Sequence, residues 1–160
     1  MSEIMAIILG ITLAFLTVII GYVLQVFIKM HNNKVKIRNT LIQIKGQVDI
    51  KHKLLKEYVD INKDSILEDK LKTINEKLND YNLYESKDII LLKTFNSLYV
   101  EYMKSFDDSL LNKQCDESED KINYIKDYYN ELVSNHNSYK SNGLSLFLSK
   151  AFSLEDEKTY

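Results

Sequence analysis

The sequence predicts an all-α protein in which one N-terminal transmembrane helix continues into an up-and-down antiparallel four-helix bundle. Three observations lead to this prediction. Residues 4–28 contain no charged side chain. The 160 residues include no proline and only four glycines, so the usual helix breakers are scarce. From residue 37 onward, apolar side chains recur at intervals of three and four, the spacing that lines one face of a helix.

The uncharged run from Ile4 to Ile28 is long enough to cross a membrane. It has 25 residues, whereas about 20 residues at roughly 1.5 Å each span a hydrocarbon core about 30 Å thick. A signal peptide would begin with basic residues and end at small residues, but Glu3 is the only charge before the run. A buried core helix is the other alternative. We expect residues 1–3 to form a short tail and residues 4–28 to lie in the lipid bilayer.

Basic residues follow the apolar run and none precedes it. Lys29, Lys34, Lys36 and Arg38 crowd its C-terminal end, which by the positive-inside rule predicts a single-pass protein of the plasma membrane with its soluble part in the cytoplasm. Residues 29–56 hold eight basic side chains against the single acid Asp49, a net charge of +7. These cations would also attract an anionic lipid surface, although membrane topology alone accounts for them.

The soluble helical bundle is expected over residues 29–139. Its first helix should continue from the membrane span without a break to about Asn62, as a rigid stalk whose apolar seam is interrupted at Lys51. Polar stretches near 62–65, 83–87 and 112–117 separate the later helices and argue against one continuous coiled coil. The third helix is expected to begin at Ser86 or Asp88 and the fourth within 116–118. The four predicted seams are Ile37, Leu41, Ile44, Val48, Leu55 and Tyr58; Leu67, Leu71, Ile74, Leu78 and Tyr81; Ile89, Leu92, Phe95, Tyr99, Tyr102, Phe106 and Leu110; and Ile122, Ile125, Tyr129, Leu132, His136 and Tyr139.

Residues 140–160 are expected to form a short amphipathic segment and a tail. Gly143 marks a plausible helix stop, after which an apolar stripe covers residues 144–152. This stripe would either cap the bundle or lie in the membrane interface. The last residues, 155–160, are polar and are expected to fray.

Two blocks of residues resemble the LemA family, bacterial membrane proteins with an N-terminal anchor and a helical bundle. The first block is Arg38-Asn39 followed by Gln47-Val48-Asp49-Ile50, and the second is Tyr129-Asn130, Val133 and Asn137 followed by Tyr139-Lys140-Ser141-Asn142. The chain departs from the family where prolines are usual, at Asp60 and Lys140, and residues 65–115 match only as a helical pattern. A divergent member is therefore implied.

The resemblance supplies a fold and an anchor but no catalytic residues. It singles out a polar set: Arg38, Asn39, Gln47, Asp49, Asn130 and Asn137. Hydrogen bonding between helices is the simpler interpretation of this set, and ligand binding is the alternative.

The residues predict no enzyme active site and no cofactor. His31, His52 and His136 are scattered without metal-ligand spacing, and the glycines form no phosphate-binding loop. His136, at a seam position, is expected to be a hydrogen-bonded core residue. Cys115 cannot form an intrachain disulfide, and the acids around it should raise its pKa.

These observations favour a scaffold or interaction protein of the bacterial cell envelope, working with a protein partner or a second copy of itself. The alternative is a membrane-surface or lipid-binding module that uses the basic stretch 29–56 and the stripe 144–152. Neither a nucleic acid nor a small-molecule substrate is indicated, because no base-stacking motif or polar pocket is evident.

Overall fold

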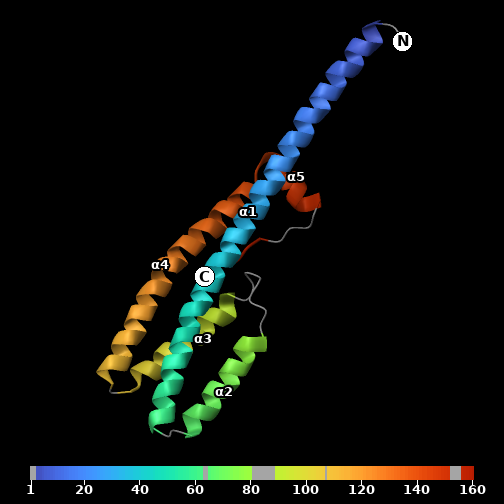
Figure 1. Ribbon diagram of the computed structural model, residues 1–160. Helices are drawn as coiled ribbons and strands as arrows, with labels where there is room; N and C mark the ends of the chain where they lie inside the picture. Colours follow the sequence, from blue (N-terminus) through green and yellow to red (C-terminus); the bar gives the residue numbers. More distant parts are fainter. Residues whose placement is uncertain (1–2, 63–64, 81–88, 107, 152–155) are drawn as a thin grey trace.

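The computed structural model describes residues 3–62, 65–80, 89–106, 108–151 and 156–160. This part of the chain is helical with no strand, and Figure 1 shows one long helix with the others gathered along its C-terminal half. The all-α prediction is confirmed. The helices are α1 (Glu3–Asn62), α2 (Ser65–Asp80), α3 (Ile89–Lys104), α4 (Ser109–Lys140) and α5 (Gly143–Ala151).

Helix α1 is the spine of the molecule. Its 60 residues correspond to a rod roughly 90 Å long at about 1.5 Å per residue. It runs without interruption from the apolar segment to Asn62, as the absence of breakers predicted. Each of the other four helices packs against it. The C-terminal half of α1 together with α2–α5 is called the helical body below.

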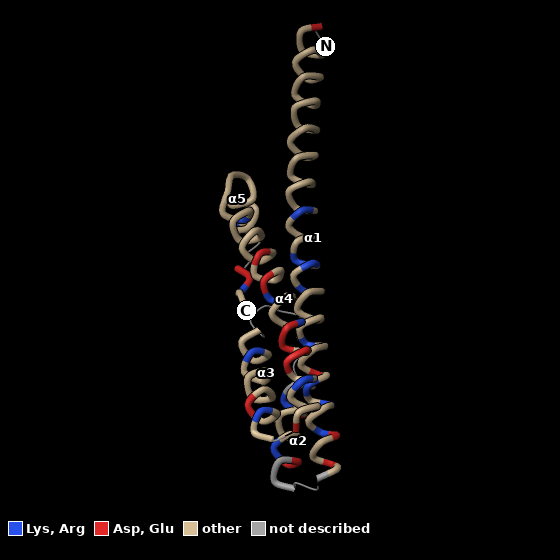
Figure 2. Tube along the Cα trace, turned by 90° about the vertical axis from the view of Figure 1, so that its left-hand side faces the viewer, with Lys and Arg blue, Asp and Glu red and all other residues tan. Residues whose placement is uncertain are grey.

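The N-terminal half of α1 projects beyond the helical body. Its most apolar 18-residue window has a mean hydropathy of 2.7, and 0% of that window is buried. Figure 2 shows this half free of charge except at its tip, where Glu3 lies, and lysines begin only where the other helices approach. By length and composition, α1 is able to cross a membrane.

The core of the helical body joins α1, α2, α3 and α4. Of the predicted seam positions, Ile44, Leu92, Tyr99 and Tyr129 are among the most completely buried. Leu67, Leu78 and Tyr81, predicted for the second seam, lie outside the residues whose side chains the structure describes, as do Ser86 and Asp88. The buried apolar residues of this core are Ile37, Leu41, Ile44, Val48, Leu55, Val59, Leu71, Ile89, Leu92, Phe95, Tyr99, Met103, Leu111, Cys115, Ile122, Tyr129 and Val133.

The boundary between α3 and α4 differs from the prediction. Helix α3 ends at Lys104 and α4 begins at Ser109, not within 116–118. Asp108 is the reason, because its carboxylate accepts hydrogen bonds from the backbone N–H groups of Leu110 and Leu111 at 2.9 and 3.0 Å and so caps the new helix. The polar stretch 112–117 therefore lies inside α4. Leu110, assigned to the third seam, is exposed in the first turn of α4.

The C-terminal residues 156–160 are not frayed in the structure. They lie along α4, where the side-chain amide of Asn137 donates to the carbonyl of Glu157 at 2.8 Å and accepts from its N–H at 3.0 Å. The Tyr160 N–H donates to Asn130 at 2.8 Å, and its half-buried ring packs against the main core. The expectation of a frayed end was wrong for these residues because side-chain amides on α4 satisfy the tail backbone.

Helix α5 forms as predicted but buries only part of its apolar stripe. Gly143, expected to stop a helix, is its first residue and has a φ of 54°, a left-handed conformation that glycine adopts without strain. Leu148 packs with Val26 and Met30 of α1 in a second, smaller apolar cluster. Phe147, another member of the predicted stripe, is 68% exposed. Phe152 lies outside the described residues.

Candidate functional site

The most unusual group inside the helical body is the buried cation Lys51. Its ammonium donates to the side-chain carbonyl of Asn96 on α3 at 2.7 Å and to the carboxylate of Glu119 on α4. Lys51 is 0% exposed, whereas the Glu119 side chain is 32% exposed. Asn96 also donates to Glu119 at 3.2 Å. Lys51 does not simply interrupt the α1 seam, because its charge is paired across three helices.

The electrostatics of this cluster favour the ion pair. Burial raises the pKa of the Glu119 carboxyl, but the hydrogen bonds and charge of Lys51, helped by Asn96, outweigh burial and leave that pKa below its ordinary value. The nearby thiol of Cys115 is fully buried. Burial is the main reason that its pKa is raised, with Asp116 and Glu119 acting in the same direction and Lys51 opposing them. The acids thus contribute as predicted, but burial is the larger cause.

Polar contacts next to Lys51 continue along α1. His52 Nδ1 lies 2.9 Å from the hydroxyl of the buried Tyr99. Burial lowers the pKa of His52 and raises that of Tyr99. One turn earlier, the hydroxyl of Ser118 donates to the backbone carbonyl of Gln47 at 3.3 Å. These contacts fix the register of α1 against α3 and α4.

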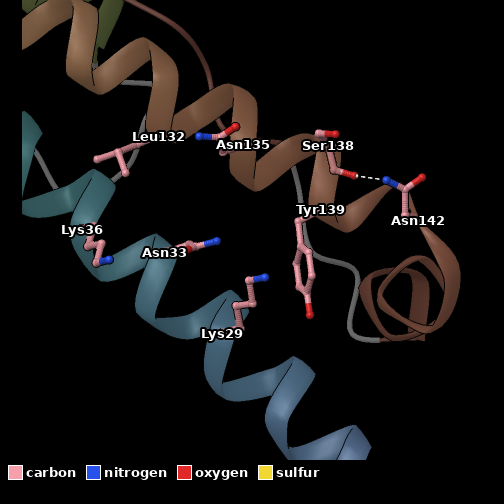
Figure 3. Close-up of a pocket in the computed structure, with 8 residues that line it drawn as sticks. All are labelled: Lys29, Asn33, Lys36, Leu132, Asn135, Ser138, Tyr139 and Asn142. Carbon is pink, nitrogen blue, oxygen red and sulfur yellow. Dashed lines mark hydrogen bonds between the residues drawn. The ribbon is translucent and has the colours of Figure 1, made fainter.

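A second polar feature lies where α1 leaves the helical body. A groove of about 490 Å³ separates α1 from the C-terminal end of α4. Figure 3 shows that Lys29, Asn33 and Lys36 of α1 face residues of α4 across it. The ammonium of Lys29 lies 4.4 Å from the ring centroid of Tyr139, within cation–π range. The eight residues that line the groove are Lys29, Asn33, Lys36, Leu132, Asn135, Ser138, Tyr139 and Asn142.

The six residues of the predicted polar set do not form one site. Arg38 and Asn39 are exposed on α1. Asp49 pairs with Lys45 at 2.7 Å one turn away, and Gln47 meets Ser118. Asn130 and Asn137 hold the tail residues Tyr160 and Glu157 instead of bonding to the first helix.

The histidines are separated in the structure as in the sequence. His136 is buried in the core, as its seam position predicted, but its Nδ1 has no hydrogen-bond partner among the described residues. Burial lowers its pKa; Glu157 opposes this effect, and the positive charges of Lys140 and Lys34 reinforce it. Within the described ranges, no three His, Cys, Asp or Glu side chains come together as metal ligands.

Sequence reasoning missed both polar features for identifiable reasons. The predicted start of the fourth helix places Glu119 in its first turn, where an acid suits the helix dipole, so the sequence does not identify it as the partner of Lys51. The groove depends on the pairing of α1 with the far end of α4, which no local pattern specifies. The only available signal was Lys29 and Lys36 seven residues apart, two helical turns along one face.

Comparison with protein families, curated proteins and solved structures finds no match to the chain.

Proposed function

We propose that this chain is a single-pass membrane protein that holds a helical body against the cytoplasmic face of a bacterial plasma membrane, where it acts as a scaffold or interaction protein. One observation carries the proposal. The most apolar 18-residue window of α1 lies outside the helical body, with 0% of it buried. A core helix would be covered by its neighbours, whereas an exposed surface of this size is stable only in a nonpolar environment.

The arrangement of the remaining elements supports the same proposal. Because α1 is continuous, a membrane-embedded segment would position the helical body rigidly relative to the bilayer. The proposed body is an up-and-down bundle of α1–α4, supported by the packing of α3 and α4 against α1 and against each other. The cations that follow residue 28 favour the cytoplasmic side. Membership of the LemA family is part of this proposal and rests on the two sequence blocks alone.

A role at the membrane surface is a second candidate, favoured by the position of α5. This helix packs beside Val26 and Met30, at the level where an anchored α1 would leave the bilayer, and it exposes Phe147 there. The basic stretch 29–56 should attract an anionic membrane surface less strongly than its net charge suggests. Lys51 is buried inside the body, and Lys45 and Lys53 pair with acids on their own helix. Only the cations nearest residue 28 lie within about 10 Å of an anionic surface.

Membrane extraction tests anchorage and labelling tests orientation. We expect the full chain to remain in the membrane pellet after washing at alkaline pH or high salt, and to be released only by detergent. A cysteine introduced at exposed Tyr124 should be protected from an impermeant maleimide in intact cells and should react after lysis. The matched control replaces Ser2 with cysteine, which the same reagent should label in intact cells. Release of the chain by the alkaline wash would refute anchorage, and the opposite labelling pattern would refute the orientation.

The interaction role requires a separate test, which is in-cell crosslinking from positions on the outer face of α4. Tyr124 and Tyr128 are exposed there one turn apart, and tyrosine is common in protein interfaces. A photocrosslinker at Tyr124 should yield a discrete adduct, either with another protein or with a second copy of this chain. Recovery of the monomer alone from several such positions would contradict a scaffold role.

A further inference from the structure

The groove between α1 and α4 has an unbalanced positive charge. Lys29 and Lys36 both line it, and within the described part of the chain neither ammonium forms an ion pair with a carboxylate. By contrast, Lys34 approaches Glu157 at 3.8 Å. The Tyr139 ring beneath Lys29 holds that ammonium at the mouth of the groove without neutralising it. The groove therefore attracts an anion.

Hydrogen-bond donors complement this charge. Asn33 on α1 and Asn135 on α4 line the groove from opposite helices (Figure 3), and each carries a side-chain amide. The Asn142 amide is already used, since it donates to the carbonyl of Ser138 at 3.0 Å. Two ammonium groups and two amides around one groove suit the oxygens of a phosphate group.

The position of the groove relative to the bilayer indicates that its phosphate ligand belongs to a lipid. Lys29 directly follows the uncharged run, and Lys36 lies seven residues further, roughly 10 Å along the helix axis. The headgroup layer on each side of a bilayer is about 5 to 8 Å thick. If residues 4–28 span the membrane, the Lys29 end of the groove lies at headgroup depth and the Lys36 end lies just beyond it, within reach of the lysine side chain. The exposed side chains of Tyr22 and Val18, seven and eleven residues before Lys29, lie on the same side of α1 toward the hydrocarbon, where acyl chains would run.

We propose that this groove binds the phosphate headgroup of an anionic phospholipid. Lys29 and Lys36 pair with the phosphate oxygens, while Asn33 and Asn135 donate hydrogen bonds. A phosphatidylcholine headgroup binds less well because its quaternary ammonium is repelled by the same two lysines. Free phosphate binds less well because it lacks acyl chains to contact α1. This inference rests on the proposed membrane anchorage.

Native mass spectrometry of the full chain in uncharged detergent tests the proposal, with phosphatidylglycerol or phosphatidylcholine added at equal concentration. We expect phosphatidylglycerol to be retained at least tenfold better. Each basic residue at a membrane surface contributes about a fivefold gain in binding, so Lys29→Gln with Lys36→Gln should reduce retention about 30-fold. The double change to arginine should preserve binding, and protection of the buried Cys115 from maleimide confirms that each variant is folded.

The matched control is Lys34→Gln with Arg38→Gln. It removes the same charge from the same stretch of α1, but these residues lie about half a helical turn away from the side that faces the groove. We expect retention to change less than threefold. Equal losses for the two pairs would indicate diffuse attraction and overturn the proposed site, as would equal retention of the two lipids. Displacement of the lipid by an equal concentration of inorganic phosphate would overturn the assignment to a lipid.

Failure of this inference is distinguishable from failure of the proposed function. If the chain stays in alkaline-washed membranes but shows no lipid preference, the proposed anchor stands and only the proposed lipid site is overturned. If the wash releases the chain, both the proposed anchor and the proposed lipid site are overturned.

Discussion

The buried ion pair predicts an asymmetric response to mutation. Glu119→Gln leaves the Lys51 ammonium charged and fully buried, with only the Asn96 carbonyl and a neutral amide as acceptors. Removing one partner from a buried pair typically costs about 3 to 5 kcal/mol. Because the glutamine oxygen can still accept a hydrogen bond, we expect a loss of about 3 kcal/mol in the free energy of unfolding.

Lys51→Met should lower the free energy of unfolding much less than Glu119→Gln does. The remaining Glu119 carboxylate is 32% exposed and still accepts from the Asn96 amide at 3.2 Å, so water can solvate it. Methionine also fills the space of the lysine chain among apolar neighbours. We expect a loss of about 1 kcal/mol or less. The double variant should resemble Lys51→Met alone, which implies a coupling energy of about 3 kcal/mol between the two residues.

The assay uses urea unfolding of the full chain in mild detergent, with Cys115 as the probe. The thiol is buried and is the chain's single cysteine, so a short maleimide pulse labels only molecules whose helical body has opened. Far-UV circular dichroism provides a second measurement of the same transition. Lys45→Met is the control, because Lys45 and Asp49 are both partly exposed and their ion pair should contribute about 0.5 kcal/mol or less. Equal destabilisation by Glu119→Gln and Lys51→Met, or a double variant less stable than either, would refute this reasoning.

Two further predictions concern His136 and the tail. Burial holds the pKa of His136 below 6.5 in the folded state. The unfolded chain therefore binds the proton more readily than the folded chain does. As a result, the free energy of unfolding should be highest above pH 6.5 and should decrease as the pH falls below that value. His136→Leu should reduce this acid sensitivity in urea titrations at pH 7.5 and 5.5; an unchanged pH dependence would exclude His136 as its source. Asn137→Ala removes two hydrogen bonds to Glu157, about 1 kcal/mol each, so trypsin cleavage after Lys158 should accelerate roughly 10- to 30-fold by mass spectrometry. Asn123→Ala, on the exposed side of α4, should leave this rate unchanged, and equal rates for the two variants would contradict the tail contact.

The sequence was sufficient to predict what depends on local periodicity. The spacing of Ile37, Leu41, Ile44 and Val48 places them on one face of any helix that forms, and all four are buried in the core. The continuity of α1 follows from the absence of breakers. The predicted α3–α4 boundary was wrong because the third apolar seam was continued to Leu110, whereas Asp108 already caps the next helix.

Features that depend on the packing of distant segments could not be predicted in this way. Lys51 and Glu119 are 68 residues apart, and their pairing follows from the register between α1 and α4. Asn137 contacts the tail 20 residues away through backbone atoms, which carry no sequence signal of their own. A lysine on an apolar seam was nevertheless a usable clue, because a buried cation requires an acidic partner on a facing helix.

The register that buries Lys51 also determines what faces the proposed membrane. The packing of α1 against α4 extends from Lys51 and Glu119 to the groove at Lys29 and Tyr139, and both helices are unbroken between these points. A shift of one residue along α1 would rotate its side chains by about 100°, separating Lys51 from Glu119 and turning Lys29 and Lys36 away from α4. The cost of leaving Lys51 unpaired therefore disfavours such a shift. We infer that the buried ion pair stabilises the orientation in which the groove faces the proposed lipid headgroups, about 20 to 30 Å along the helix from the pair itself.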